Sequence, residues 1–141
     1  MGVTRAVIVM ALRFIAAHST FQINPDTDQP AIAYKSSYDG TVQGGETTRD
    51  GLVTLDAATP DNVMGNSIVV HELTHWAQVR AGLFATTQRC VLEQQAYRMQ
   101  ADYLRSQNVN PALLAADTPV NREMLHSTDC NDPFGAQLIG K

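Results

Sequence analysis

The residues His71-Glu72-Leu73-Thr74-His75 form a His-Glu-x-x-His motif. Successive residues of an α-helix turn by about 100°, so two histidines four positions apart lie about 40° apart on one face. Both imidazoles can then reach one zinc ion, and Glu72 can contact a water molecule at that ion without being a ligand. The motif predicts His71 and His75 as zinc ligands and Glu72 as a general base. The alternative is two helical histidines that each bond a carbonyl group.

A third ligand must lie downstream, because catalytic zinc has three protein ligands and keeps its fourth position for water. A continuation with Gly at position 78 and His at position 81 is ruled out, since the chain has Gln78 and Ala81 there. The remaining candidates are acidic or imidazole side chains: Glu93, Asp102, His126 and Asp129.

Helix geometry favours Glu93 among these candidates. In a helix over about residues 90–106, Glu93 borders the apolar, core-facing stripe, whereas Asp102 lies about 180° away on the polar face. A carboxylate on a buried face is costly unless a cation or metal ion pairs with it. We therefore predict one zinc ion per chain, held by the two motif histidines and Glu93. A buried ion pair or a helix-cap contact of Glu93, or His126 as third ligand, are the alternatives.

This set of residues predicts zinc-dependent hydrolysis of a peptide or other amide bond. Zinc lowers the pKa of bound water from about 15.7 toward about 7, and Glu72 takes the proton and passes it to the leaving nitrogen. A further donor must stabilise the oxyanion. Tyr97, one turn beyond Glu93, and His126 are the candidates for this catalytic role, with structural hydrogen bonds as the alternative for both.

Three helices are expected to carry or support these residues. The first spans about residues 4–18, although a targeting segment is an alternative there. Thr59-Pro60-Asp61 is typical of a helix start, and the helix that it opens should run through the motif to about Arg80, with Gly82 as its C-terminal cap. The third spans about residues 90–106.

Short strands are expected over residues 31–34 and 52–55, with Asp50-Gly51 as a two-residue hairpin turn before the second strand. Beyond the third helix, short helices over about 112–116 and 120–126 precede an irregular tail from about residue 127. The predicted fold is therefore α+β, with three or four helices and a small sheet.

Composition limits the classes of protein that the chain can belong to. Its 141 residues suit one domain over 1–141, and the net charge of −4 with scattered Lys and Arg argues against a nucleic-acid partner. No apolar run is long enough for a membrane span. The expected partner is a peptide or protein substrate.

Cys90 and Cys130 are the two cysteines of the chain. A disulfide between them would tie the tail to the start of the third helix and would place the protein in an oxidising, extracytoplasmic compartment. Two separate buried thiols are the alternative.

Over residues 50–105 the chain resembles the zincin metallopeptidases and, within them, the gluzincin pattern. The resemblance rests on the His71–His75 motif and on Glu93 in a following helix, within Cys90-Val91-Leu92-Glu93-Gln94-Gln95-Ala96-Tyr97-Arg98-Met99-Gln100. It implies a small sheet over the motif helix, with an edge strand that pairs an extended peptide, for which residues 52–55 are the candidate. The chain departs from the family pattern at Leu92 and Tyr97, where Asn and a second carboxylate that orients a ligand histidine are usual.

Two alternative functions remain open from the sequence. The first is a zinc-binding interaction module without turnover, because a chain of 141 residues has little room for a second lobe that closes over a substrate. The second is a domain that binds no metal and carries the motif by chance.

Overall fold

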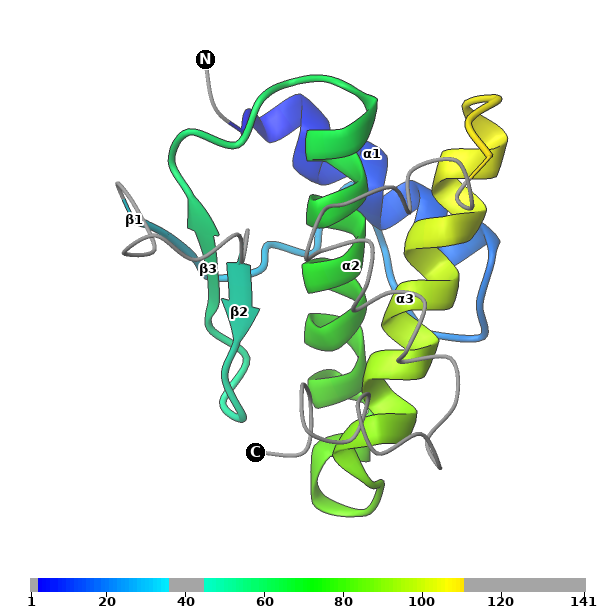
Figure 1. The fold of residues 1–141 in the computed structure, drawn as a ribbon. Coiled ribbons are helices and arrows are strands. Elements are labelled where there is room, and N and C mark those ends of the chain that lie inside the picture. The colour runs from blue at the N-terminus through cyan, green and yellow to red at the C-terminus, as the bar shows by residue number, and fades with distance from the viewer. Residues whose placement is uncertain (1–2, 36–44, 111–141) are drawn as a thin grey trace.

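The structure is a computed structural model of the chain that describes residues 3–35 and 45–110. It has the predicted α+β class, with three α-helices, one short 3₁₀-helix and a mixed three-stranded sheet (Figure 1). In chain order the elements are α1 Arg5–Ala17, β1 Ile32–Lys35, β2 Gly45–Thr47, β3 Val53–Asp56, α2 Val63–Arg80, η1 Leu83–Ala85 and α3 Arg89–Ser106. The helices expected over 112–116 and 120–126 and the tail from 127 lie outside the described residues.

The strand β3 lies in the middle of the sheet, in the order β1-β3-β2. It pairs in parallel with β1, where Ile32 faces Val53, and antiparallel with β2, where Thr47 faces Val53. The prediction of an edge strand at residues 52–55 is therefore wrong. The physical reason is burial on both faces of the strand, since Val53, Thr54 and Leu55 are all buried, as in a strand covered on both sides.

The turn between β2 and β3 is longer than predicted. Thr48 and Leu52 are joined by a backbone hydrogen bond of 3.0 Å, so three residues rather than two form the loop. Gly51 is the last of them and has a φ of +89°, the position at which a three-residue hairpin loop favours glycine. The Asp50-Gly51 signal thus located the hairpin but not its length.

Helix α2 begins at Val63, three residues later than the Thr59-Pro60 signal predicts. Thr59 instead closes a turn with the carbonyl of Asp56, and the Asn62 side chain caps the helix by accepting a hydrogen bond of 2.9 Å from the backbone N–H of Gly65. The backbone of Pro60 lies close to Gly65 here, so that a Cβ on Gly65 would lie 1.9 Å from the carbonyl oxygen of Pro60. At the other end, Gly82 with a φ of +77° follows the helix, as predicted.

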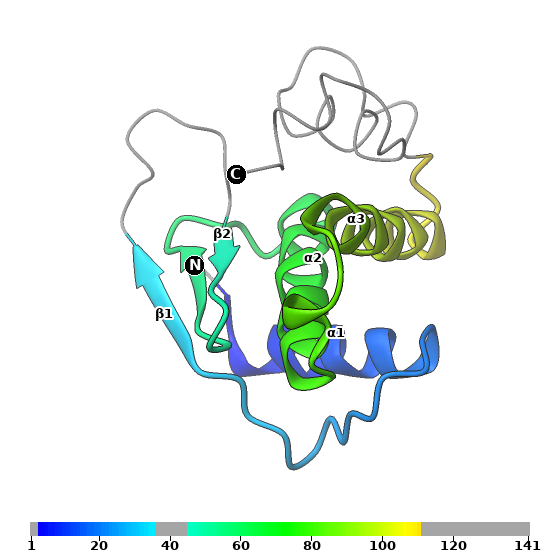
Figure 2. The ribbon, with the colours of Figure 1, turned by 90° about the horizontal axis from the view of Figure 1, so that it is seen from below.

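Helix α2 is the central element of the described structure. The sheet lies on one side of it and α3 runs alongside it on the other, while α1 crosses behind (Figures 1 and 2). The largest fully buried side chains of the main apolar cluster come from α1, β3 and α2: Leu12, Ile15, Val53, Leu55, Val69, Val70 and Leu73. Helix α2 is therefore covered on nearly all sides, and the polar motif that it carries is buried with it.

Candidate metal centre

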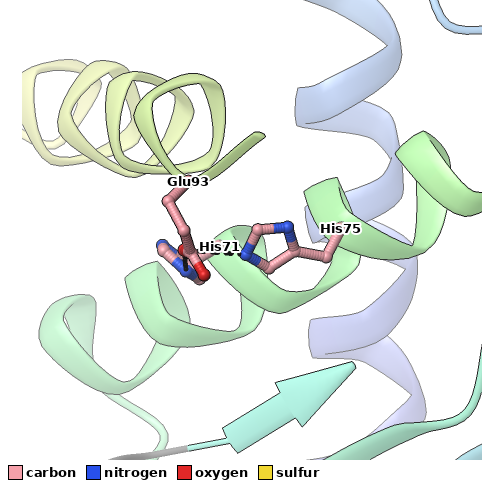
Figure 3. A group of neighbouring side chains, drawn as sticks. All are labelled: His71, His75 and Glu93. Carbon is pink, nitrogen blue, oxygen red and sulfur yellow. Dashed lines mark hydrogen bonds and ion pairs between the residues drawn. The ribbon is translucent and has the colours of Figure 1, made fainter. Parts of the chain in front are cut away.

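The structure brings His71, His75 and Glu93 together between α2 and α3. Their side chains converge from the two helices (Figure 3), and one ligand atom from each lies within 4.8 Å of the others. Oε1 of Glu93 lies 3.1 Å from Nε2 of His71 and 2.9 Å from Nε2 of His75. Two imidazole nitrogens and a carboxylate oxygen are donors that suit zinc and other transition metals. The group could therefore hold a metal ion.

The orientation of α3 follows the expectation from helix geometry. Glu93 points toward α2 and its side chain is only 12% exposed, whereas Asp102 is 50% exposed and forms an ion pair with Arg105 on the same helix. The other two candidate ligands, His126 and Asp129, lie outside the described residues.

The buried charges of this group depend on one another. Burial acts to raise the pKa of Glu93, but the charge of His75 and hydrogen bonds from both imidazoles hold that pKa well below its usual range. Burial acts to lower the pKa of His75, but the charge of Glu93 and the hydrogen bond to it outweigh burial and raise that pKa above its ordinary value of 6.5. A metal ion that binds here competes with protonation of His75, because an imidazole nitrogen that ligates a metal must be deprotonated.

Two glutamines contact the outer nitrogens of the histidines. Nδ1 of His75 lies 2.7 Å from Oε1 of Gln78, and Nδ1 of His71 lies 3.1 Å from Oε1 of Gln100. These roles were not predicted from the sequence, although a signal was present. Gln78 lies seven residues, or two helical turns, after His71, and Gln100 lies seven after Glu93, so each glutamine shares a face with a ligand.

Glu72 lies beside the group of three without joining it. Its Oε2 is 4.0 Å from Nε2 of His71, and its Oε1 accepts a hydrogen bond of 3.0 Å from the hydroxyl of Thr47 on β2. The same hydroxyl lies 3.1 Å from the backbone carbonyl of Glu72. Gly45 makes this approach possible, because a Cβ there would lie 2.9 Å from Cγ of Glu72. Strand β2 therefore holds the carboxylate in place.

The two candidates for an oxyanion donor have different outcomes. Tyr97 is buried on α3, and its ring centroid lies 4.3 Å from that of His71, so it borders the site. His126 lies outside the described residues and stays a prediction.

The predicted disulfide also stays a prediction. Cys90 lies in the first turn of α3, three residues before Glu93, but Cys130 lies outside the described residues.

Comparisons with protein-family models, with curated proteins and with solved structures found no match for this chain. Within residues 3–35 and 45–110, no helix is long and apolar enough to cross a membrane. The function of the chain must therefore be inferred from the geometry of the site.

Proposed function

We propose that the chain is a zinc-dependent hydrolase of the zincin type, which cleaves peptide or other amide bonds. The observation that carries this proposal is the separation of two buried carboxylates. Glu93 touches both histidines, while Glu72 is held by Thr47 at the border of the group. Such a separation suits one carboxylate as a ligand and the other as a base.

Each residue then has a definite task. His71, His75 and Glu93 would hold the metal, which when bound supplies a Lewis acid that makes water acidic near neutral pH. Glu72 would take a proton from the attacking water and deliver it to the nitrogen that leaves. Tyr97 is our candidate among the described residues for the donor to the developing oxyanion.

Strand β2 is the part of the sheet best placed to receive a substrate. Among the strands that the structure describes it lies at one end of the strand order, and Thr47 and Gly45 bring it against Glu72. An extended peptide that pairs along a strand gains affinity from main-chain hydrogen bonds. We therefore propose that an extended substrate pairs with β2 and not with residues 52–55.

A metal-binding interaction module without turnover is the second candidate function. The central position of β3 favours it, because that strand offers no edge to a substrate. The placement of Glu72 argues against it, since a module that only holds a metal needs no buried base beside the ligands.

Paired substitutions test the proposal. The assay measures zinc content and cleavage of a fluorogenic peptide library. It compares zinc-loaded wild-type protein with the variants Glu72→Gln and Glu93→Gln. We expect Glu72→Gln to keep its zinc and to lose about 10²–10⁴-fold in rate, as on removal of a general base. Glu93→Gln should bind zinc more weakly. Wild-type protein that holds zinc and cleaves nothing in the library would favour the interaction module, and equal zinc loss in both variants would make Glu72 a ligand.

A further inference from the structure

Two buried glutamines complete the polar interface between α2 and α3. Gln78 is fully buried and Gln100 is 2% exposed. A buried amide is costly unless its oxygen and its NH₂ group both find partners. The partners of these two amides therefore determine which way each one points.

The neighbours of Gln78 admit one orientation of its amide. One side of the amide lies 2.9 Å from the backbone carbonyl of Leu92 and 2.8 Å from Oε1 of Gln95. A carbonyl oxygen only accepts hydrogen bonds, so the NH₂ group of Gln78 must face Leu92. The amide oxygen then faces Nδ1 of His75 at 2.7 Å, and that nitrogen must carry a proton to donate.

The same reasoning applies to Gln100 through a serine. The hydroxyl of Ser67 donates its single proton to the backbone carbonyl of Met64 at 2.7 Å. Ser67 can therefore only accept the hydrogen bond of 3.1 Å from the NH₂ group of Gln100. This leaves the amide oxygen of Gln100 facing Nδ1 of His71, which must also be protonated.

We propose that Gln78 and Gln100 are positioning residues that fix both imidazoles with a proton on Nδ1, so that Nε2 of each is the nitrogen offered to the metal. Neutral amides thus take the place of the carboxylate or carbonyl that usually orients a metal-binding histidine. The inference rests on the metal centre of the proposed function and is independent of hydrolysis.

The two glutamines should differ in importance. Gln78 is hydrogen-bonded to His75 on its own helix and to the carbonyl of Leu92, the residue just before Glu93. It therefore positions one histidine and the turn of α3 that carries the carboxylate. Gln100 is hydrogen-bonded to His71 and Ser67, which both belong to α2. Loss of the Gln78 amide should weaken metal binding more.

Zinc affinity measured against a competing chelating indicator tests the roles of the amides. Methionine matches glutamine in shape but is a poor acceptor. We expect Gln78→Met and Gln100→Met to raise the Kd for zinc by about 10–100-fold, with the larger effect at Gln78. Gln100→Glu keeps an acceptor at Nδ1, and the hydroxyl of Ser67 can turn to donate to it, so its Kd should stay within about threefold of wild type. The exposed Gln107 provides a matched control as Gln107→Met, with no change expected.

Nitrogen-15 spectra of histidine-labelled, zinc-loaded protein give a second readout. In the wild type, both site histidines should show a protonated Nδ1 and a zinc-bound Nε2, and coordination through Nδ1 would overturn the inference even if a methionine variant failed to fold. Unchanged zinc affinity in folded Gln78→Met and Gln100→Met, or equal loss in Gln100→Glu and Gln100→Met, would also overturn it. Wild-type protein that binds no zinc would instead overturn the metal centre, and with it the proposed function. Turnover enters neither measurement.

Discussion

The two sides of α2 differ in chemistry although both are buried. On one side the helix presents Val69, Val70 and Leu73, which are fully buried in one apolar cluster with side chains of α1, β3 and α3. Toward α3 it presents His71, His75 and Gln78, and each of them contacts a polar group of another side chain. The first side is stable by burial alone, whereas the second is stable only as long as every donor and acceptor is satisfied.

This difference shows how one helix can carry a core and a site at once. An apolar contact tolerates small shifts, because the hydrophobic effect has no direction. A metal centre requires its donors at fixed distances and angles. The apolar side therefore determines whether the chain folds, and the polar side determines what the folded chain can bind. Substitutions on the two sides should have separable effects.

The largest expected effect is on the polar side. His75→Ala should abolish stoichiometric zinc binding, because two ligands remain where a catalytic site needs three. The variant should still unfold cooperatively, since the apolar cluster is intact. Metal analysis of protein purified without added metal, together with a thermal melt, checks both statements. Zinc retained at one equivalent would place the metal elsewhere in the chain.

The apolar side should give the opposite pattern. Leu12 on α1 is fully buried, so Leu12→Ala should lower the free energy of unfolding by about 2–5 kcal/mol. Its zinc Kd, measured below the melting temperature, should match that of wild type. A large loss of zinc affinity in this variant would show that the apolar and polar sides of α2 are coupled.

Zinc itself should stabilise the folded chain. Free zinc at 100 times its Kd adds about 2.7 kcal/mol to the free energy of unfolding. Denaturant titrations with and without zinc measure this gain, which should vanish in His75→Ala. Magnesium should give no comparable gain, because it prefers oxygen ligands. Equal stabilisation by both ions would argue against a nitrogen-rich site.

The contact between β2 and Glu72 should have a smaller effect on stability. Thr47→Val removes the hydroxyl that donates to Glu72 and leaves a buried carboxylate with one partner fewer. We expect the free energy of unfolding to fall by about 1–3 kcal/mol, with zinc affinity unchanged. Thr47→Ser keeps the hydroxyl and serves as the control. An effect of Thr47→Val on zinc affinity would make Glu72 part of the metal site.

The metal-free protein should show a modest dependence of stability on pH from the same group. The raised pKa of His75 contributes stability that is fully present below pH 6.5 and is lost as the pH rises through the folded-state pKa. The lowered pKa of Glu93 contributes stability that is present above pH 4.5 and is lost as the pH falls through its folded-state value.

The stability difference between metal-free wild type and Glu93→Gln should therefore be largest between pH 4.5 and 6.5. Denaturant titrations across this range measure it. A difference that grows steadily above pH 6.5 would contradict the ion pair.

The parts of this molecule that the sequence predicted depend on local patterns. The spacing of the motif and the faces of two helices placed His71, His75 and Glu93 toward one another, and Gly82 marked the end of α2. Each of these signals lies within a few turns of a single helix, so each can be found without knowledge of tertiary contacts.

The parts that could not be predicted depend on long-range pairing. The pattern of residues 52–55 predicts a strand whether that strand lies at the edge or in the centre of the sheet. Only the pairing with β1 and β2 makes β3 central. The start of α2 shifted because Asn62 competes with Thr59 as the cap. Thr47 could not be linked to Glu72 from the sequence, because 25 residues separate them and the contact exists only once β2 packs on α2.

The two glycines near the ends of α2 should respond differently to saturation mutagenesis. At position 65, any side chain would collide with the carbonyl of Pro60 at 1.9 Å, so a selection for folded protein should return glycine alone. Beyond its two chain neighbours, no atom of the described residues lies within 4 Å of a Cβ placed on Gly82, and its φ of +77° is the restriction there, so asparagine should also survive. The amino acids tolerated at these two positions would thus distinguish a glycine required by steric contact from a glycine required by its backbone conformation.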